Sequence, residues 1–224
     1  MDGTLLDKHF DDYFWEQYLP EHYSLRHDLG LEQARAELLA RYQRTAGSLL
    51  WADLDHWSRE LGFDLVALKE QLASLIVLRP RVESFLDRCR QAGKQLYLVT
   101  NAHHRTLALK LGRVDLASRL DRIVHAGSDA GRPELPALPP VAAINRAKEE
   151  PEFWLELQGL LAFDPARSLL VDDSEAVLAT AASCGIRHLR HIARPSSRLP
   201  ARFSPRFPSI EHFDEIMPPL PGAW

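Results

Sequence analysis

The sequence predicts an α/β fold in which a parallel β-sheet is covered by helices and joined to a separate all-helical segment. Two observations predict this. From about residue 79 onward, short apolar runs alternate with amphipathic helical patterns, which is typical of a parallel sheet with helical crossovers. Residues 10–78 instead show helical periodicity throughout and contain no strand-like run. We therefore expect an α/β core formed by residues 1–9 and 79–224, and a helical cap formed by residues 10–78.

The predicted strands are short apolar runs suited to burial on both faces of a sheet. The clearest runs cover residues 95–99 and 168–171, and weaker candidates cover residues 122–124 and 186–189. Polar residues directly follow the two clearest runs: Thr100 and Asn101 follow one, and Asp172 and Asp173 follow the other. Functional sites of parallel sheets lie at the carboxyl ends of the strands, so we expect these four residues to meet at one edge.

Two helices of the core carry recognisable start and stop signals. Pro80 is expected to be the first helical residue of one, because proline is favoured at that position. The apolar face of this helix consists of Val82, Phe85, Leu86 and Cys89. Ser174 is expected to cap a second helix, which Gly185 would end.

Composition and charge exclude several classes of function. The chain has 224 residues, of which 46% are hydrophobic and 26% charged, as in ordinary globular proteins. Its net charge of −4 gives no reason to expect a nucleic-acid partner, and no apolar run approaches the roughly 18 residues that span a bilayer. No secretory leader is visible, and the two cysteines, Cys89 and Cys184, give no disulfide framework. We expect a cytoplasmic protein without a nucleic-acid or membrane partner.

Four polar positions together indicate a phosphate-binding centre. Asp2 begins an Asp-Gly-Thr turn where a first strand should end. Thr100 could donate a hydrogen bond to a phosphate, and Lys148 could neutralise its charge. Asp172 and Asp173 offer the hard oxygen ligands that Mg²⁺ prefers. Each has a structural alternative as a turn, a helix cap or a solvated side chain, but their order along the chain favours one shared site.

These motifs resemble the haloacid dehalogenase (HAD) superfamily of phosphatases. That superfamily carries Asp-x-Asp-Gly-Thr, a Ser or Thr after a strand, a Lys and an acidic pair, in this order. The matching segments are residues 1–4, 95–101, 148 and 168–174. Within the superfamily the sequence is most similar to the bacterial GMP/IMP nucleotidases, through residues 10–15, 99–103, 148–154 and 172–176. The resemblance implies a Rossmann-like core with an inserted helical cap, Mg²⁺ as the cofactor and a purine 5′-nucleotide, a small phosphate ester, as the substrate.

The resemblance also implies a role for each matching residue. Asp2 would protonate the leaving ester oxygen and then activate water. The metal would bind Asp173 first, Asp172 second and the backbone carbonyl of Asp2. The residues that would hold the transferring phosphoryl group are Thr100, Asn101 (through its backbone) and Lys148.

The first motif departs from the superfamily at its beginning. The nucleophile of the superfamily is an Asp two positions before Asp2, which here falls on the residue directly upstream of Met1. The central first strand that carries this Asp would be missing too. Two interpretations stay open: the start of the gene is placed at an internal methionine, or the chain is truly short. In the second case we expect a very poor catalyst, a remnant that binds a ligand or partner.

A second departure lies in the proline-rich residues 128–147, part of which could be an unstructured insertion. Residues 131–133 (Gly-Arg-Pro) resemble the Gly-x-Pro that normally precedes the lysine, with Glu134 in the place of the lysine. We assign the lysine to Lys148, because residues 149–154 continue the family pattern.

Two further groups could contact a substrate. His103 and His104 follow Thr100 closely, and a surface loop is the alternative for them. Aromatic residues of the cap could stack on a purine base, with core packing as the alternative for most: Phe14, Trp15, Trp51 and Trp57. The leading hypothesis is a Mg²⁺-dependent nucleotidase that releases phosphate from GMP or IMP. The alternative enzyme is a phosphatase for another small phosphate ester, and the oligomeric state is not predicted.

Overall fold

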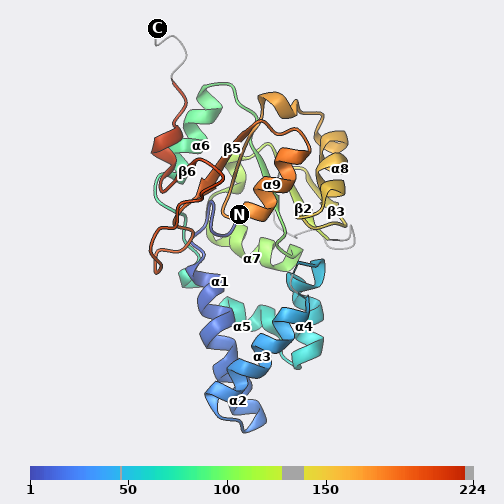
Figure 1. Ribbon diagram of the computed structural model, residues 1–224. Helices are drawn as coiled ribbons and strands as arrows, with labels where there is room; N and C mark the ends of the chain where they lie inside the picture. Colours follow the sequence, from blue (N-terminus) through green and yellow to red (C-terminus); the bar gives the residue numbers. More distant parts are fainter. Residues whose placement is uncertain (46, 128–138, 220–224) are drawn as a thin grey trace.

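The computed structural model describes residues 1–45, 47–127 and 139–219, and Figure 1 shows a sheet-containing part above a helical part. The helices around the sheets are α6 (Val82–Gln91), α7 (His104–Arg113), α8 (Pro151–Leu161) and α9 (Glu175–Ser183). The helices of the lower part are α1 (His9–Tyr13), α2 (Leu19–His27), α3 (Leu31–Thr45), α4 (Leu54–Leu61) and α5 (Leu65–Gln71), with a π-helical turn at Phe14–Tyr18. This arrangement confirms the predicted α/β class.

The strands form two three-stranded sheets, where the sequence predicted one. The first sheet has the order β1 (Tyr97–Thr100), β2 (Arg122–Ala126) and β3 (Val141–Ile144). The second has the order β4 (Leu169–Asp172), β5 (His188–Ile192) and β6 (Ser209–Ile210). All neighbours are parallel, with Tyr97 opposite Arg122 in the first sheet and Leu169 opposite His188 in the second. The expectation of a parallel sheet is confirmed, and its division into two is a correction.

Two strands, β3 and β6, were not predicted, because their own sequences carry little strand signal. β3 is short, follows two prolines and contains two alanines, so it carries little strand propensity. It lies within the stretch that we expected to be unstructured in part, and it corrects that expectation for residues 141–144. Residues 128–138 of that stretch lie outside the described residues. β6 has only two residues, which is too few to give an alternating pattern.

The helix signals were confirmed in one case and wrong in the other. Ser174 caps α9, because its Oγ accepts a hydrogen bond from the Val177 amide at 3.4 Å. The helix after Pro80, by contrast, begins at Val82. Arg81 adopts a left-handed conformation with φ of +69°, so the chain cannot become helical before it.

The lower part has an apolar core of its own. Its buried members include Phe14, Leu19, Leu38, Trp57 and Leu65. Within the described residues of 10–78 the elements are helical or turn, as expected, and the division of the chain at residues 10 and 78 stays a prediction. Among the described helices, none has both the length and the apolar character needed to cross a membrane. The cytoplasmic location also stays a prediction.

A cavity of about 740 Å³ separates the two sheets. In the described part of the chain, β1 pairs only with β2 and β4 pairs only with β5, so each has one unpaired edge. Consecutive residues of both strands line the cavity, which is expected where backbone edges border it. Met1 and apolar side chains such as Leu86 also line it. The two sheets therefore face each other across an apolar slot bordered by open strand edges.

Candidate active site

The chain begins in a tight turn at the carboxyl ends of β1 and β4. The carbonyl oxygen of Met1 accepts hydrogen bonds from the amides of Thr4, Leu5 and Leu6, at 3.2, 2.8 and 3.1 Å. Buried Arg79 holds the same turn from outside, because its Nη1 donates to the carbonyl oxygens of Gly3 and Thr4, both at 3.2 Å. Sequence reasoning missed Arg79, which belongs to no recognisable motif. The turn fixes Asp2 and the residues that follow it.

Gly3 allows this turn to lie against the acidic pair. Its φ is +69°, and a Cβ at this position would clash with Asp173 Oδ2. Thr4 Oγ1 donates a hydrogen bond to Asp173 Oδ1 at 3.3 Å. The Asp-Gly-Thr motif thus packs directly on Asp173, and only glycine fits between them.

Lys148 and Asp172 form a buried ion pair with 2.6 Å between Lys148 Nζ and Asp172 Oδ2. Burial would lower the pKa of Lys148, but the charge of Asp172 outweighs it and raises that pKa. The pKa of Asp172 is lowered in turn, because Lys148 outweighs the effect of burial. Asp172 also accepts a hydrogen bond from the Ser174 amide at 3.0 Å. Both groups therefore stay charged at neutral pH.

Asp173 is in a different state from its neighbour. Burial, and next the charge of Asp172, raise its pKa above the ordinary value for an aspartate. Among the described residues it forms no ion pair, although its carboxylate is largely buried. One carboxylate of the pair is therefore neutralised by Lys148, and the other has no cation of its own.

Thr100 and Asn101 connect β1 to the loop that carries Lys148. Thr100, the last residue of β1, is buried, and its Oγ1 accepts a hydrogen bond from the Ala102 amide at 3.1 Å. Asn101 Oδ1 accepts from the Lys148 amide at 2.9 Å, and Asn101 Nδ2 donates to Glu149 Oε2 at 2.8 Å. The sequence analysis assigned only the Asn101 backbone to the site. Its side chain has the further effect of fixing Lys148.

A buried ion network attaches Asp2 to the lower helices. Lys110 Nζ of α7 lies 2.6 Å from Asp2 Oδ1 and 2.5 Å from Asp11 Oδ2 of α1. Lys69 Nζ of α5 lies 2.8 Å from Asp11 Oδ1 and 4.4 Å from the centre of the Phe14 ring. Both lysine side chains are 1% exposed. Sequence reasoning missed this network, because Asp11, Lys69 and Lys110, the partners that join Asp2 to it, share no motif and come from three separate helices.

The pKa shifts of the network follow from its geometry. Burial would lower the pKa of Lys110, but Asp11 and then Asp2 outweigh it and raise that pKa. Lys69 has one close carboxylate partner, and burial keeps its pKa below the ordinary value. Burial would raise the pKa of Asp11, but Lys110 and then Lys69 outweigh it, so the pKa of Asp11 is lowered. Charge is thus balanced across the contact between the core and the lower helices.

All the residues predicted for the site lie in this connected group. Asp2 belongs to the turn that contacts Asp173, Asp172 pairs with Lys148, and Lys148 is held by Asn101 beside Thr100. The family model described as "haloacid dehalogenase-like hydrolase" matches residues 1–185. The chain belongs to the haloacid dehalogenase-like hydrolase family. It is therefore a hydrolase.

Two curated relatives of this hydrolase are 32% identical to it over 220 residues, which cover 98% of this chain and 92% of each relative. They are the GMP/IMP nucleotidase YrfG of Escherichia coli (strain K12) and that of Shigella flexneri. The resemblance to these nucleotidases is confirmed. The roles of the site residues stay predictions.

Solved structures of the family share the fold of this hydrolase. A HAD phosphatase from Thermococcus onnurineus aligns with a TM-score of 0.73 at 21% identity, covering 96% of this chain and 93% of that one. A HAD-superfamily hydrolase of subfamily IA from Geobacter sulfurreducens aligns with a TM-score of 0.57 at 19% identity, covering 96% and 90%. These likenesses support the Rossmann-like core.

The hydrolase has donor groups that fit the divalent cation used by its family. Asp173 offers a carboxylate that has no cationic partner among the described residues, and the Gly3 turn packs directly against it. Asp172 lies next to it, and carboxylate and carbonyl oxygens are the ligands that Mg²⁺ prefers. The residues present therefore suit Mg²⁺.

A small hollow of about 40 Å³ lies between the lower helices and the active site. Trp51 lines it on one side, and Asn101 and Glu149 line it on the other. Trp51 is 43% exposed, whereas Phe14 and Trp57 are fully buried and pack the core of the lower part. Trp51 is thus the exposed aromatic side chain beside the site, and the partly buried Trp15 stacks on it with 6.4 Å between the ring centres.

Proposed function

We propose that this hydrolase removes the phosphate group from purine 5′-nucleotides, with GMP and IMP as its first substrates and Mg²⁺ as its cofactor. The observation that carries the proposal is the connected group of buried charges around Lys148, Asp172 and Asp173. A lysine beside one neutralised and one unpaired carboxylate suits a phosphate dianion bound together with a divalent cation. The similarity to GMP/IMP nucleotidases supports the choice of substrate.

The side chains of this site have complementary tasks in the proposed reaction. Thr100 Oγ1 and Lys148 Nζ would bind the oxygens of the phosphoryl group. Asp2 would hold a proton near the leaving oxygen, in reach of Lys110, which keeps it oriented. Asp172, Asp173 and the backbone carbonyl of Asp2 would hold Mg²⁺. When bound, the ion supplies positive charge that neutralises the phosphoryl oxygens.

We place the attacking carboxylate on an Asp directly upstream of Met1. The α-amino nitrogen of Met1 is buried and interacts electrostatically with Lys148, Asp172 and Asp173. A residue bonded to this nitrogen would therefore carry its side chain among these groups. The chain leading to it would enter the cavity between the open edges of β1 and β4, whose apolar lining suits a buried strand.

The proposed chemistry proceeds in two displacements. An oxygen of the upstream carboxylate attacks phosphorus, the bond from phosphorus to the nucleoside oxygen breaks, and Asp2 gives its proton to that oxygen. A water molecule then attacks the phosphorus of the aspartyl phosphate, the bond from phosphorus to the aspartate oxygen breaks, and Asp2 accepts a proton from the water. Inorganic phosphate leaves, and both aspartates return to their starting states.

The lower helices would determine which nucleotide is accepted. Trp51 offers an exposed aromatic face beside Asn101, at the border between the two parts of the molecule. Stacking on an aromatic face suits a purine ring and tolerates both guanine and hypoxanthine. We therefore propose Trp51 as the side chain that contacts the base.

The deciding experiment measures phosphate release from GMP and IMP with Mg²⁺ by two proteins. One is the 224-residue chain, and the other is the same chain extended upstream by its in-frame codons. We expect turnover by the extended protein alone. Equal turnover by both would contradict the placement of the nucleophile. If neither acts on GMP or IMP while the extended protein cleaves other small phosphate esters, the substrate assignment is wrong. Binding without any turnover by either would indicate a non-enzymatic remnant.

A further inference from the structure

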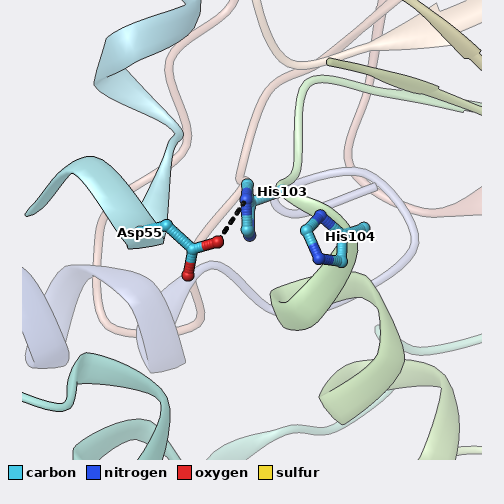
Figure 2. A group of neighbouring side chains, drawn as sticks. All are labelled: Asp55, His103 and His104. Carbon is cyan, nitrogen blue, oxygen red and sulfur yellow. Dashed lines mark ion pairs between the residues drawn. The ribbon is translucent and has the colours of Figure 1, made fainter. Parts of the chain in front are cut away.

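A second group of metal-binding side chains lies at the contact between α4 and α7. It consists of Asp55 near the start of α4, His103 just before α7 and His104 at its first position, and Figure 2 shows His103 between Asp55 and His104. One ligand atom from each lies within 4.8 Å of the other two. None of the three belongs to the connected group around Lys148 described above.

The separations in this group suit a shared cation better than direct hydrogen bonds. His103 Nε2 lies 3.8 Å from Asp55 Oδ2 and 3.6 Å from Asp53 Oδ1, beyond the range of a good hydrogen bond. Ligand atoms around a tetrahedral zinc ion, each about 2.0–2.1 Å from the metal, lie roughly 3.3 Å apart. The ligand atoms of this group lie within 4.8 Å of one another, so movements of up to about 1.5 Å would bring them to such positions.

One ring nitrogen of His103 makes no hydrogen bond in the described structure. Its side chain is 14% exposed, and its Nδ1 is buried without a hydrogen-bond partner among the described residues. Burial, and next the neighbouring His104, lower the pKa of His103 to about 4. Burial also lowers the pKa of His104. Both imidazoles are thus neutral at pH 7, the form that binds metals.

Neighbouring side chains fix Asp55 for this purpose. Arg105 Nη1 donates a hydrogen bond to Asp55 Oδ1 at 2.9 Å and leaves Oδ2 turned toward His103. Asp53 caps α4, because its Oδ1 accepts hydrogen bonds from the amides of Asp55 and His56, both at 2.9 Å. The carboxylate of Asp55 is therefore oriented before any metal arrives.

We propose that Asp55, His103 and His104 bind one divalent transition-metal ion, which bridges the lower helices and the core. Two imidazole nitrogens and one carboxylate oxygen form a donor set typical of zinc, and water would complete the coordination. The site differs in ligand type from the oxygen-only centre at Asp173. It does not depend on the proposed nucleotidase activity. By joining α4 to α7, the ion would restrain the lower helices relative to the sheets.

Cobalt binding tests the site directly. Co²⁺ is titrated into protein without a histidine tag, in the presence of excess Mg²⁺, and the visible absorption bands of imidazole-bound Co²⁺ are recorded. We expect the bands to saturate at one equivalent and to disappear on addition of Zn²⁺. Affinity should fall at least tenfold in the double variant His103→Ala/His104→Ala and in Asp55→Asn. It should stay unchanged in His27→Ala, a histidine exposed on α2.

The contrary outcomes are equally clear. Absence of the bands in the unmodified protein, or the same affinity in Asp55→Asn and the double variant as in His27→Ala, would overturn the site. Because alanine could disturb folding, circular dichroism is compared for all variants, and Asp55→Asn keeps the shape of the side chain. Hydrogen exchange tests the bridge: Zn²⁺ should slow exchange at the starts of both α4 and α7. Slowing at α7 alone would overturn the bridging role.

Discussion

Lys110 Nζ lies 2.6 Å from Asp2 Oδ1 and 2.5 Å from Asp11 Oδ2, so one buried ammonium group joins the start of the chain to the first of the lower helices. Asp2 is the residue proposed as the acid and base of the reaction. Its position is therefore coupled to the packing of α1 and α7. Several consequences of this and the neighbouring contacts can be measured.

Replacing Lys110 by methionine keeps the length of the side chain and removes its charge. Asp2 loses its cation, and Asp11 keeps only Lys69. Removing one partner of a buried ion pair costs about 3–5 kcal/mol. We expect a loss of this order in the free energy of unfolding, measured by urea denaturation. Lys8→Met is the control, because Lys8 makes a half-exposed pair with Asp12 that should contribute at most about 1 kcal/mol.

A Lys110→Met protein as stable as Lys8→Met would show that the buried network contributes nothing beyond a surface pair. The interpretation of Asp2 as a residue held by the lower helices would then be wrong.

Asp11 should make the stability of the protein depend on pH in the acid range. Its pKa in the folded protein is lowered, because Lys110 and Lys69 outweigh the effect of burial. A lowered folded pKa contributes stability above the unfolded value of about 3.9, and this contribution is lost as pH falls toward the folded pKa. Wild type should thus exceed Asp11→Asn most between pH 5 and 7, and the difference should shrink below pH of about 4.

Urea denaturation at a series of pH values measures this difference. Asp28→Asn, at the exposed end of α2, serves as the control. A difference between wild type and Asp11→Asn that stays constant from pH 7 down to pH 3 would contradict the assignment.

Gly3→Ala should be more harmful than alanine at another left-handed glycine. Gly93 has nearly the same φ, +68° against +69°, but a Cβ there meets nothing within 4 Å. Gly93→Ala therefore measures the backbone strain alone, about 1–2 kcal/mol. Gly3→Ala adds the contact with Asp173 Oδ2, so we expect a larger loss of stability and weaker binding of Mg²⁺. Equal losses in urea denaturation would show that the turn can move away from Asp173.

Neutralising the two neighbouring aspartates should change stability in opposite directions. Asp172→Asn leaves the Lys148 ammonium buried without its partner, which should cost about 3–5 kcal/mol. Asp173→Asn removes a largely buried carboxylate that has no cation of its own, so it should stabilise the protein in EDTA. The same variant should lose the rise in melting temperature that Mg²⁺ gives the wild type. Destabilisation by both variants in EDTA would contradict this picture of the site.

The sequence predicted the parts of this structure that depend on local patterns. The apolar runs that became β1 and β4 end in polar residues, and Ser174 has the cap signal of α9, so these elements were predictable. The same holds for the nearness of the polar ends of β1 and β4, which Lys148 connects. The predicted helix start at Pro80 was wrong, because Arg81 has a left-handed backbone conformation. Nothing in the sequence indicates that conformation. β6 forms because it pairs with β5, and its two residues are too few to give a strand pattern of their own.

Long-range ion pairs were beyond such reasoning. Lys110 has the same spacing as the apolar residues on the buried face of α7, and Lys69 is likewise buried in α5. Nothing in the local sequence says that both point at Asp11. The only available signal was a lysine at a position where a helix buries its apolar side chains. The slot between the sheets could not be predicted either, because its prediction requires the order in which the strands pair.

The slot between β1 and β4 has a consequence for handling the protein. The unpaired edge of a β-strand can form hydrogen bonds with a strand of another molecule. Two such edges around an apolar space therefore favour self-association. We expect the 224-residue chain to form oligomers through these edges as its concentration rises, and to aggregate on heating. A segment of the same chain that filled the slot would pair with both edges at once. It would thereby prevent association between molecules and keep the protein in solution.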